Sequence, residues 1–140
     1  MILNDAARAA LNSSRLAHLV TLEPDGSPQV TVVWVRAVGD EVQMAHLGGA
    51  NGRKVRNLLR DPRCTLSIET GGRDPIGLDE YLVVHGRAEV TEGGAAELLQ
   101  DLARGYLGPD VKFPPMDDPP PGCVVHIHAE RVGGVGPWGD

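Results

Sequence analysis

The chain has 140 residues and a formal net charge of −6, with a pI near 5.3. An acidic chain repels nucleic acid and anionic membranes as a whole, so we expect neither as a partner. No apolar run approaches the roughly 20 residues of a membrane helix, and the first residues lack the layout of a signal peptide, which predicts a cytoplasmic protein. This length predicts one domain, residues 1–140, around one hydrophobic core.

The first half of the chain predicts a helix followed by a β-meander. Residues 1–14 include the alanine-rich run DAARAALN, which predicts a short helix over 5–12 with Asn4 or Asp5 as its cap. Three strand-like runs follow, separated by the turn sequences EPDGSP and GD. They cover 15–22, 29–38 and 41–47.

The second half adds three strands, a helix and a proline-rich loop. The strands are predicted at 63–70, 80–91 and 123–132. Gly86 lies inside the second of these and indicates a bulge or sharp bend. A helix is predicted over 92–108, and a glycine-rich tail covers 133–140. Residues 108–122 hold 6 of the 11 prolines, so they form a loop, because proline lacks the N–H that a central strand needs.

These elements predict a mainly β protein with short helices. Six strands, with helices between only some of them, favour a small closed antiparallel barrel of six strands. An open α+β sheet is the competing interpretation, but it would leave apolar strand edges exposed.

The segment GGANGRKVRNLLRDPRC, residues 48–64, gathers 5 of the 13 basic residues. It predicts a helix over 52–60, capped by Asn51 and ended by the sequence Asp61-Pro62. Helical spacing places one group of side chains toward the core and another on the opposite side. The core group is Val55, Leu58 and Leu59, and the opposite group is Arg53, Arg56 and Arg60.

Arg53 and Lys54 lie in the first turn of that helix, where cations oppose the positive end of the helix dipole. A bound anion would relieve this conflict. A phosphate could accept the free backbone N–H groups there and the bidentate guanidinium of Arg53, and the glycines at 48, 49 and 52 would allow close approach. Alternatively, these cations are solvated and pair with acidic side chains of the chain.

The order of these elements and motifs resembles the flavin-reductase-like split-barrel superfamily, the class of pyridoxamine 5′-phosphate oxidase. The motifs that carry the resemblance are DGSP, GRKVRNLLRDPRCTLSI and VHGRAEV, and the likeness covers about residues 5–132. The K-x-x-N-L-x-R-D-P-R run is most similar to actinobacterial members that use the deazaflavin coenzyme F-420. The resemblance implies an FMN-binding split-barrel fold and a homodimer with two cofactors between its subunits.

The resemblance also implies which residues bind the cofactor. Arg53 and Lys54 would hold its phosphate, with Gly52 and Arg56 beside them. The residues that would line the ring are Thr31, Val32 and Val33 on the second strand and Leu47 and Gly48 at the end of the third. Oxidases of the superfamily often have serine at the position of Gly52, so a hydroxyl contact to the phosphate is missing, which disfavours FMN. The short C-terminal segment likewise disfavours vitamin B6 oxidation.

The function that this resemblance implies is hydride transfer between F-420 and a planar unsaturated small molecule. No catalytic side chain is predicted, because the ring carries the hydride in flavin and deazaflavin chemistry. Two alternatives stay open. One is a non-catalytic protein that binds flavin, deazaflavin or tetrapyrrole, and the other is an FMN-dependent oxidase like pyridoxamine 5′-phosphate oxidase.

The remaining reactive residues predict structural roles. Cys64 and Cys123 lie in apolar surroundings without neighbours at metal spacing, which is typical of buried reduced thiols. His126 and His128 share one strand face but have no evident third ligand, so no metal site is predicted.

The two tryptophans are candidate walls for a planar ligand. Trp34 is expected in the core or at a dimer interface. Trp138 lies in the glycine-rich tail, and we hypothesise that it folds over the cofactor of a neighbouring subunit.

Overall fold

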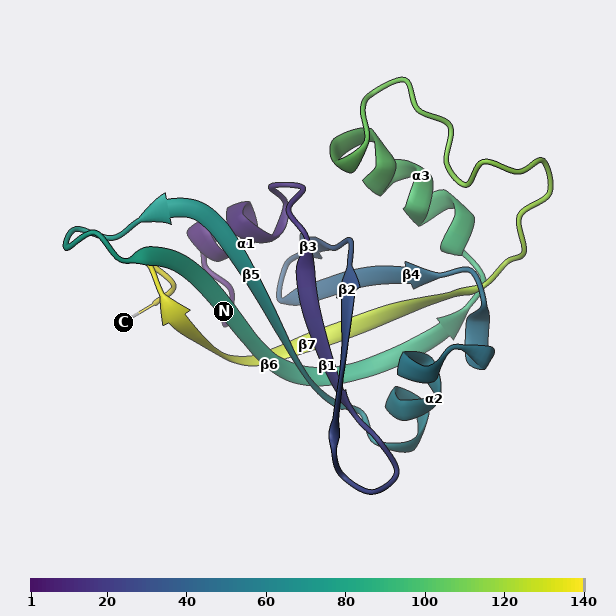
Figure 1. The fold of residues 1–140 in the computed structure, drawn as a ribbon, viewed down its shortest axis with the longest axis horizontal. Helices are drawn as coiled ribbons and strands as arrows, with labels where there is room; N and C mark the ends of the chain where they lie inside the picture. The colour runs from purple at the N-terminus through teal and green to yellow at the C-terminus, as the bar shows by residue number, and fades with distance from the viewer. Residues whose placement is uncertain (140) are drawn as a thin grey trace.

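The computed structural model describes residues 1–139, and in this part of the chain seven strands form one antiparallel sheet with three α-helices around it (Figure 1). The helices are α1 (Asp5–Leu11), α2 (Arg53–Arg60) and α3 (Ala95–Tyr106), and the 3-10 turn η1 (Gly49–Asn51) precedes α2. The strands are β1 (Ala17–Leu22), β2 (Pro28–Val33), β3 (Arg36–Val38), β4 (Glu41–His46), β5 (Arg63–Arg73), β6 (Asp79–Glu92) and β7 (Cys123–Val135). Their order in the sheet is β2-β1-β5-β6-β7-β4-β3. The prediction of a mainly β, antiparallel split barrel with short helices is confirmed.

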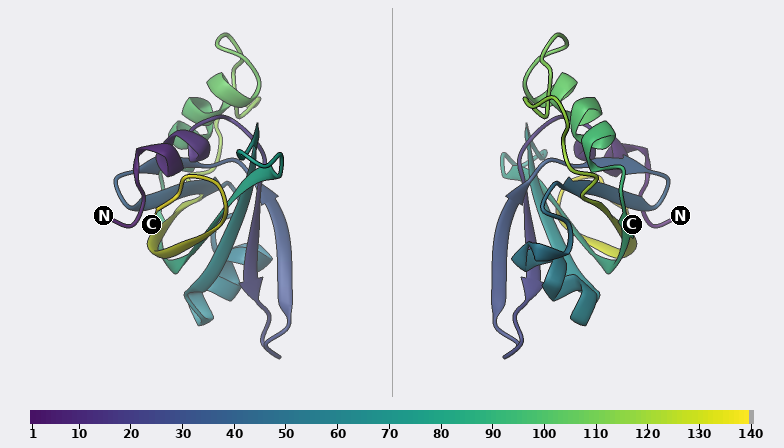
Figure 2. Two further views of the ribbon diagram at one scale, coloured as in Figure 1. Left: turned by 90° about the vertical axis from the view of Figure 1, so that its left-hand side faces the viewer. Right: turned by 90° about the vertical axis from the view of Figure 1, so that its right-hand side faces the viewer.

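The prediction of six strands in a closed barrel is wrong. The run predicted as one strand over 29–38 is divided into β2 and β3 by Trp34 and Val35. The backbone N–H of Val35 donates to the hydroxyl of Tyr106 on α3 at 3.0 Å, so this donor serves a helix and not a neighbouring strand. β2 and β3 are therefore the two outer strands of a curled but open sheet (Figure 2).

Local sequence signals account for several elements. The side chain of Asn4 accepts a hydrogen bond from the backbone N–H of Ala7 at 2.8 Å, which caps α1 as predicted. In β6 the pairing with β7 shifts register between His85 and Gly86, which confirms the predicted bulge. A Cβ atom at Gly86 would lie 2.3 Å from the backbone oxygen of His128, so the close approach of the two strands requires glycine.

The core lies inside the curl of the sheet and includes Leu19, Leu66, Val84 and Ile127. Trp138 also belongs to it: its side chain is only 6% exposed, and its indole N–H donates to the backbone oxygen of Tyr81 at 2.9 Å. Trp138 is therefore packed within its own chain, which contradicts the hypothesis that it covers a neighbour's cofactor. Residue 140, the end of the predicted tail, lies outside the described residues.

The elements around the predicted site meet at one end of the sheet. Figure 1 shows α2 below, and α3 with the proline-rich loop above, the right-hand ends of β4, β6 and β7. Chain connectivity explains this arrangement, because β4 leads into α2, β6 leads into α3, and the loop returns to β7. Among the described residues, no helix has the length and apolar character needed to cross a membrane.

Candidate anion and cofactor site

The first turn of α2 has no side-chain cap. Its N-cap is Gly52, with φ −74° and ψ 143°, and not the predicted Asn51, which ends η1. The first N–H groups of any helix lack intrahelical acceptors, and here no side-chain oxygen replaces them. The start of α2 therefore offers backbone donors together with the cations Arg53 and Lys54.

The face of α2 that packs on the sheet differs from the predicted one. Val55 and Leu58 are buried as expected, with 0% and 2% exposure. Leu59 was expected in the core but is 58% exposed, whereas the polar Asn57 is only 2% exposed. The prediction for Leu59 is wrong because the helix turns Asn57 toward polar partners on β1 and on the turn that follows it.

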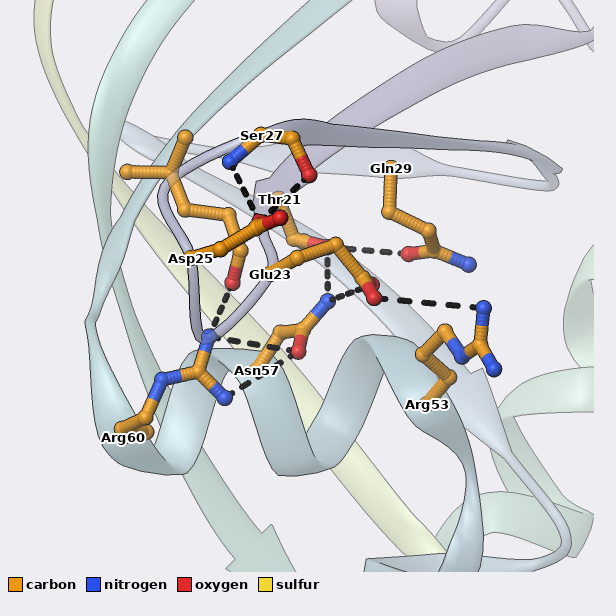
Figure 3. Close-up of polar contacts among 9 residues, drawn as sticks. Thr21, Glu23, Asp25, Ser27, Gln29, Arg53, Asn57 and Arg60 are labelled. Carbon is orange, nitrogen blue, oxygen red and sulfur yellow. Dashed lines mark hydrogen bonds and ion pairs between the residues drawn. The ribbon is translucent and has the colours of Figure 1, made fainter.

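Asn57 is the centre of a polar network between α2 and β1 (Figure 3). Its amide nitrogen donates to the Thr21 hydroxyl at 3.1 Å and to the Glu23 carboxylate at 2.9 Å. The guanidinium of Arg60 donates to the amide oxygen of Asn57 at 3.2 Å and to the backbone oxygen of Leu22. These contacts fix α2 against β1 and anchor the Glu23 carboxylate next to the start of the helix.

The basic side chains of the segment have different environments. Arg53 is 64% exposed and its guanidinium lies 3.9 Å from the Glu23 carboxylate (Figure 3). Arg63 pairs with Asp61 at 2.7 Å, and hydrogen bonds from Arg63 lower the pKa of Asp61 to about 2. Arg56 is exposed. The interpretation of solvated or internally paired cations therefore describes much of the cluster, and Lys54 is the clear exception.

Lys54 is half-buried and contacts a histidine that the sequence analysis did not place in the site. Its ammonium nitrogen lies 3.2 Å from Nδ1 of His46, at the end of β4. Burial lowers the pKa of Lys54. Burial, and secondly the charge of Lys54, lower the pKa of His46. An ammonium can only donate, so Nδ1 accepts and the proton of the neutral imidazole is on Nε2.

His46 occupies the space beside the glycine that caps α2. A Cβ atom at Gly52 would lie 2.2 Å from Nε2 of His46, and one at Gly48 would lie 2.8 Å from the same atom. The two glycines therefore make room for the imidazole. Among the isolated strand histidines the sequence puts His46 nearest the predicted site, but only the tertiary contact with Lys54 distinguishes it from a structural imidazole.

Serine at position 52 is expected to displace His46 without unfolding the protein. The backbone of Gly52 is already extended, as an N-cap serine prefers, so Gly52→Ser should change the free energy of unfolding by less than about 1 kcal/mol. The new Cβ must push the imidazole away from Lys54. The pKa of His46 should then rise toward its ordinary value, which an NMR titration of the imidazole measures. An unchanged His46 titration in this variant would contradict the observed packing.

Three of the predicted site residues line one cavity. Val32, Val33 and Lys54 contribute to a space of about 200 Å³. The other residues around it are Trp34, Ala45, Leu99 and Phe113. Lys54 is the only charged side chain in this lining, so the cavity is apolar with a cation at its wall.

Leu47 and Gly48 lie elsewhere, in a groove of about 670 Å³. The groove runs past Glu92 and the segment 120–123. Within this chain the predicted ring-lining residues are thus divided between two hollows, on β2 and after β4.

Thr31, next to Val32 on β2, has an unusual environment for a hydroxyl group. Its hydroxyl oxygen is buried and has no hydrogen-bond partner within the part of the chain that the structure describes. Buried hydroxyls are normally paired, and a ligand atom would restore a partner. The uncapped start of α2 and the half-buried Lys54 therefore fit a ligand with an anionic group.

The other candidate residues have structural roles. His126 is held by Glu41 at 2.7 Å and by Thr91 at 2.9 Å, so both of its ring nitrogens are occupied within the sheet. Cys64 and Cys123 are buried free thiols, as predicted, and burial raises the pKa of Cys64 to about 12.

Three known structures with a similar fold match most of this chain and most of their own chain. An F-420 reductase is 24% identical, with a TM-score of 0.70, over 90% of this chain and 94% of that one. A conserved hypothetical protein of Mycobacterium tuberculosis is 26% identical, with a TM-score of 0.71, over 99% and 86%. HupZ of Group A Streptococcus is 20% identical, with a TM-score of 0.65, over 99% and 98%.

No curated protein matches the sequence significantly. The family described as pyridoxamine 5′-phosphate oxidase matches residues 3–136, nearly the whole chain. The family indicates oxidoreductase chemistry of the flavin type. With its split-barrel sheet and a match of this length, the chain belongs to the pyridoxamine 5′-phosphate oxidase family.

Proposed function

We propose that the protein binds the phosphate of a flavin-type cofactor, most favourably coenzyme F-420, at the start of α2 and transfers a hydride between the cofactor and a planar unsaturated small molecule. The observation that carries this proposal is the uncapped first turn of α2 beside a half-buried Lys54 that faces an apolar cavity. A phosphate there would receive backbone N–H donors and a cation that little water screens.

The residues of the site have distinct roles in this proposal. Lys54 and Arg53 hold the phosphate beside the backbone of Gly52, with Arg56 adding positive charge nearby. The ring lies against β2, where the Thr31 hydroxyl gains a partner and the valines at 32 and 33 form the wall. Leu47 and Gly48 lie in the separate groove after β4, so within this chain they do not border a ring that is held against β2.

His46 bears on the choice of cofactor. Its imidazole occupies the space that a serine side chain at position 52 would need. The hydroxyl contact to the phosphate that the oxidases often make is therefore absent here, which disfavours FMN and leaves F-420 as the favoured cofactor. The bound cofactor supplies the hydride chemistry, while the chain binds the phosphate, orients the ring and excludes water.

A homodimer is part of the proposal. Val30 and Val32, on the outer face of β2, are 59% and 51% exposed. β2 is an outer strand with a free edge, and Val32 also borders the cavity. An exposed apolar strip on an open edge normally requires cover. A second copy would cover this strip and enclose the ring, and sedimentation should give the mass of a dimer.

Titration of the purified protein with F-420 and with FMN, followed by fluorescence, tests the function. We expect F-420 to bind more tightly, and we expect inorganic phosphate to compete with both. Reduced F-420 that binds without turnover of any unsaturated acceptor would support a carrier or sensor in place of an enzyme. Tighter FMN binding with peroxide formation would favour the oxidase, and binding of neither cofactor would contradict the proposal.

A further inference from the structure

The proline-rich loop contributes one aromatic residue to the apolar cavity. Phe113 is half-buried in a loop whose other residues are mostly exposed. Its ring lies 5.1 Å from that of Trp34 at an interplanar angle of 51°, and Trp34 in turn stacks on Tyr106 at 5.0 Å and 11°. Phe113 and Trp34 both line the cavity that contains Lys54. The loop therefore continues an aromatic row that begins on α3.

One side chain of α3 fixes the position of Phe113. The amide nitrogen of Gln100 donates to the backbone oxygen of Val111 at 2.8 Å, and its amide oxygen accepts from the backbone N–H of Phe113 at 3.1 Å. These two bonds hold the loop on both sides of residue 112. The loop is thus docked at this point, although its prolines prevent it from pairing as a strand.

From this geometry we infer that Phe113 is a ring-binding residue of the site, and that Gln100 positions it. The inference rests on the proposed function, which it extends by identifying what selects the ring. The cavity measures about 200 Å³, below the range of about 300–1,000 Å³ for a whole small-molecule site. It accommodates a flat ring between β2 and the loop, while the phosphate lies toward α2. The width of the ring slot is then set by Phe113.

Ligands that lack a phosphate separate this inference from the phosphate site. Riboflavin and the deazaflavin chromophore without its phosphate tail report the ring contact alone, whereas FMN and F-420 report both contacts. Phe113→Ala should weaken riboflavin, chromophore and cofactor binding by the same factor, about 2- to 12-fold, because it removes one aromatic contact. Competition by inorganic phosphate should be unchanged.

Gln100→Ala should weaken ring binding in the same direction but less, because it frees Phe113 without removing it. In the Phe113→Ala background, Gln100→Ala should have no further effect. If Gln100 had a purely structural role, Gln100→Ala would weaken ring binding by the same factor in the wild type and in the Phe113→Ala variant. Met116→Ala is the matched control, since Met116 belongs to the same loop, is 42% exposed and does not line the cavity.

The possible outcomes separate this inference from the proposed function. If Phe113→Ala binds the phosphate-free ring like wild type while Lys54→Ala weakens cofactor binding, the ring contact is refuted and the phosphate site stands. If wild type binds none of these ligands, both fail. Phe113→Leu keeps most of the apolar volume, so it replaces the alanine variant if that variant does not fold. It should weaken the binding of riboflavin, the chromophore and the cofactors by one common factor.

Discussion

Replacement of Lys54 by alanine should weaken the binding of a phosphorylated cofactor by about 10- to 150-fold, the effect of losing a charged hydrogen bond to phosphate. Lys54 is the half-buried cation of the basic segment, and its ammonium borders the apolar cavity. Little water competes there, so its contribution should exceed that of Arg53, which is 64% exposed and shared with Glu23. Fluorescence titration of each variant with F-420 gives the affinities.

The control for this prediction is Lys112→Ala, which removes the same charge from the other lysine of the chain. Lys112 is 70% exposed and pairs with Asp117 in the proline-rich loop. Its loss should leave cofactor affinity within about twofold of wild type, because exposed ion pairs contribute little. If Lys54→Ala and Lys112→Ala behaved alike, the effect would be one of net charge, and the proposed phosphate site would be misplaced.

The affinity should also depend on pH through Lys54. Burial lowers the pKa of its ammonium, so the charged form is lost at a lower pH than for an exposed lysine. As the pH rises, anion binding by the free protein should therefore begin to decline at a lower pH than it would with an exposed lysine at this site. This decline should be absent in Lys54→Ala and shifted to higher pH in Lys54→Arg, whose guanidinium stays protonated.

Replacement of Asn57 by alanine should lower the free energy of unfolding by about 2–4 kcal/mol, although the residue is polar and on a helix. The change removes a donor to the Glu23 carboxylate and to the Thr21 hydroxyl, and an acceptor for Arg60, in a place that is only 2% exposed (Figure 3). The three groups left behind lose hydrogen bonds to Asn57, and water cannot readily replace these bonds at a buried position. Denaturant unfolding measures the difference.

Leu59→Ala is the informative counterpart, because it lies two residues along the same helix. Leu59 is 58% exposed, so its truncation should cost less than about 0.5 kcal/mol. Helical periodicity alone predicts the opposite ranking, with the leucine in the core and the asparagine in solvent. A larger loss in Leu59→Ala than in Asn57→Ala would show that α2 packs through the face predicted from the sequence.

Asn57 also links stability to the site. It anchors Glu23, and the Glu23 carboxylate lies 3.9 Å from Arg53. Loss of Asn57 would therefore free the carboxylate to move toward or away from Arg53. The network between α2 and β1 thus reaches the proposed phosphate site through the contact of Glu23 with Arg53.

The sequence alone determined the features that depend on neighbouring residues. The cap at Asn4, the bulge at Gly86 and the position of the basic helix follow from local propensities and from the spacing of apolar residues. The proline-rich loop follows from the chemistry of its own residues. Such signals involve residues that are close together in the sequence, so they can be interpreted without knowledge of the tertiary structure.

The tertiary structure alone decided the features that join distant segments. Val35 leaves the strand because Tyr106, 71 residues later, accepts its N–H. Asn57 is buried because its partners come from the β1 region, and Trp138 enters the core because Tyr81 supplies a backbone acceptor. A hydrogen-bonding group gives no local sign of which distant partner it will find, since burial penalises only the unpaired state. The open sheet, the true face of α2 and the contact between His46 and Lys54 are therefore properties of the folded chain.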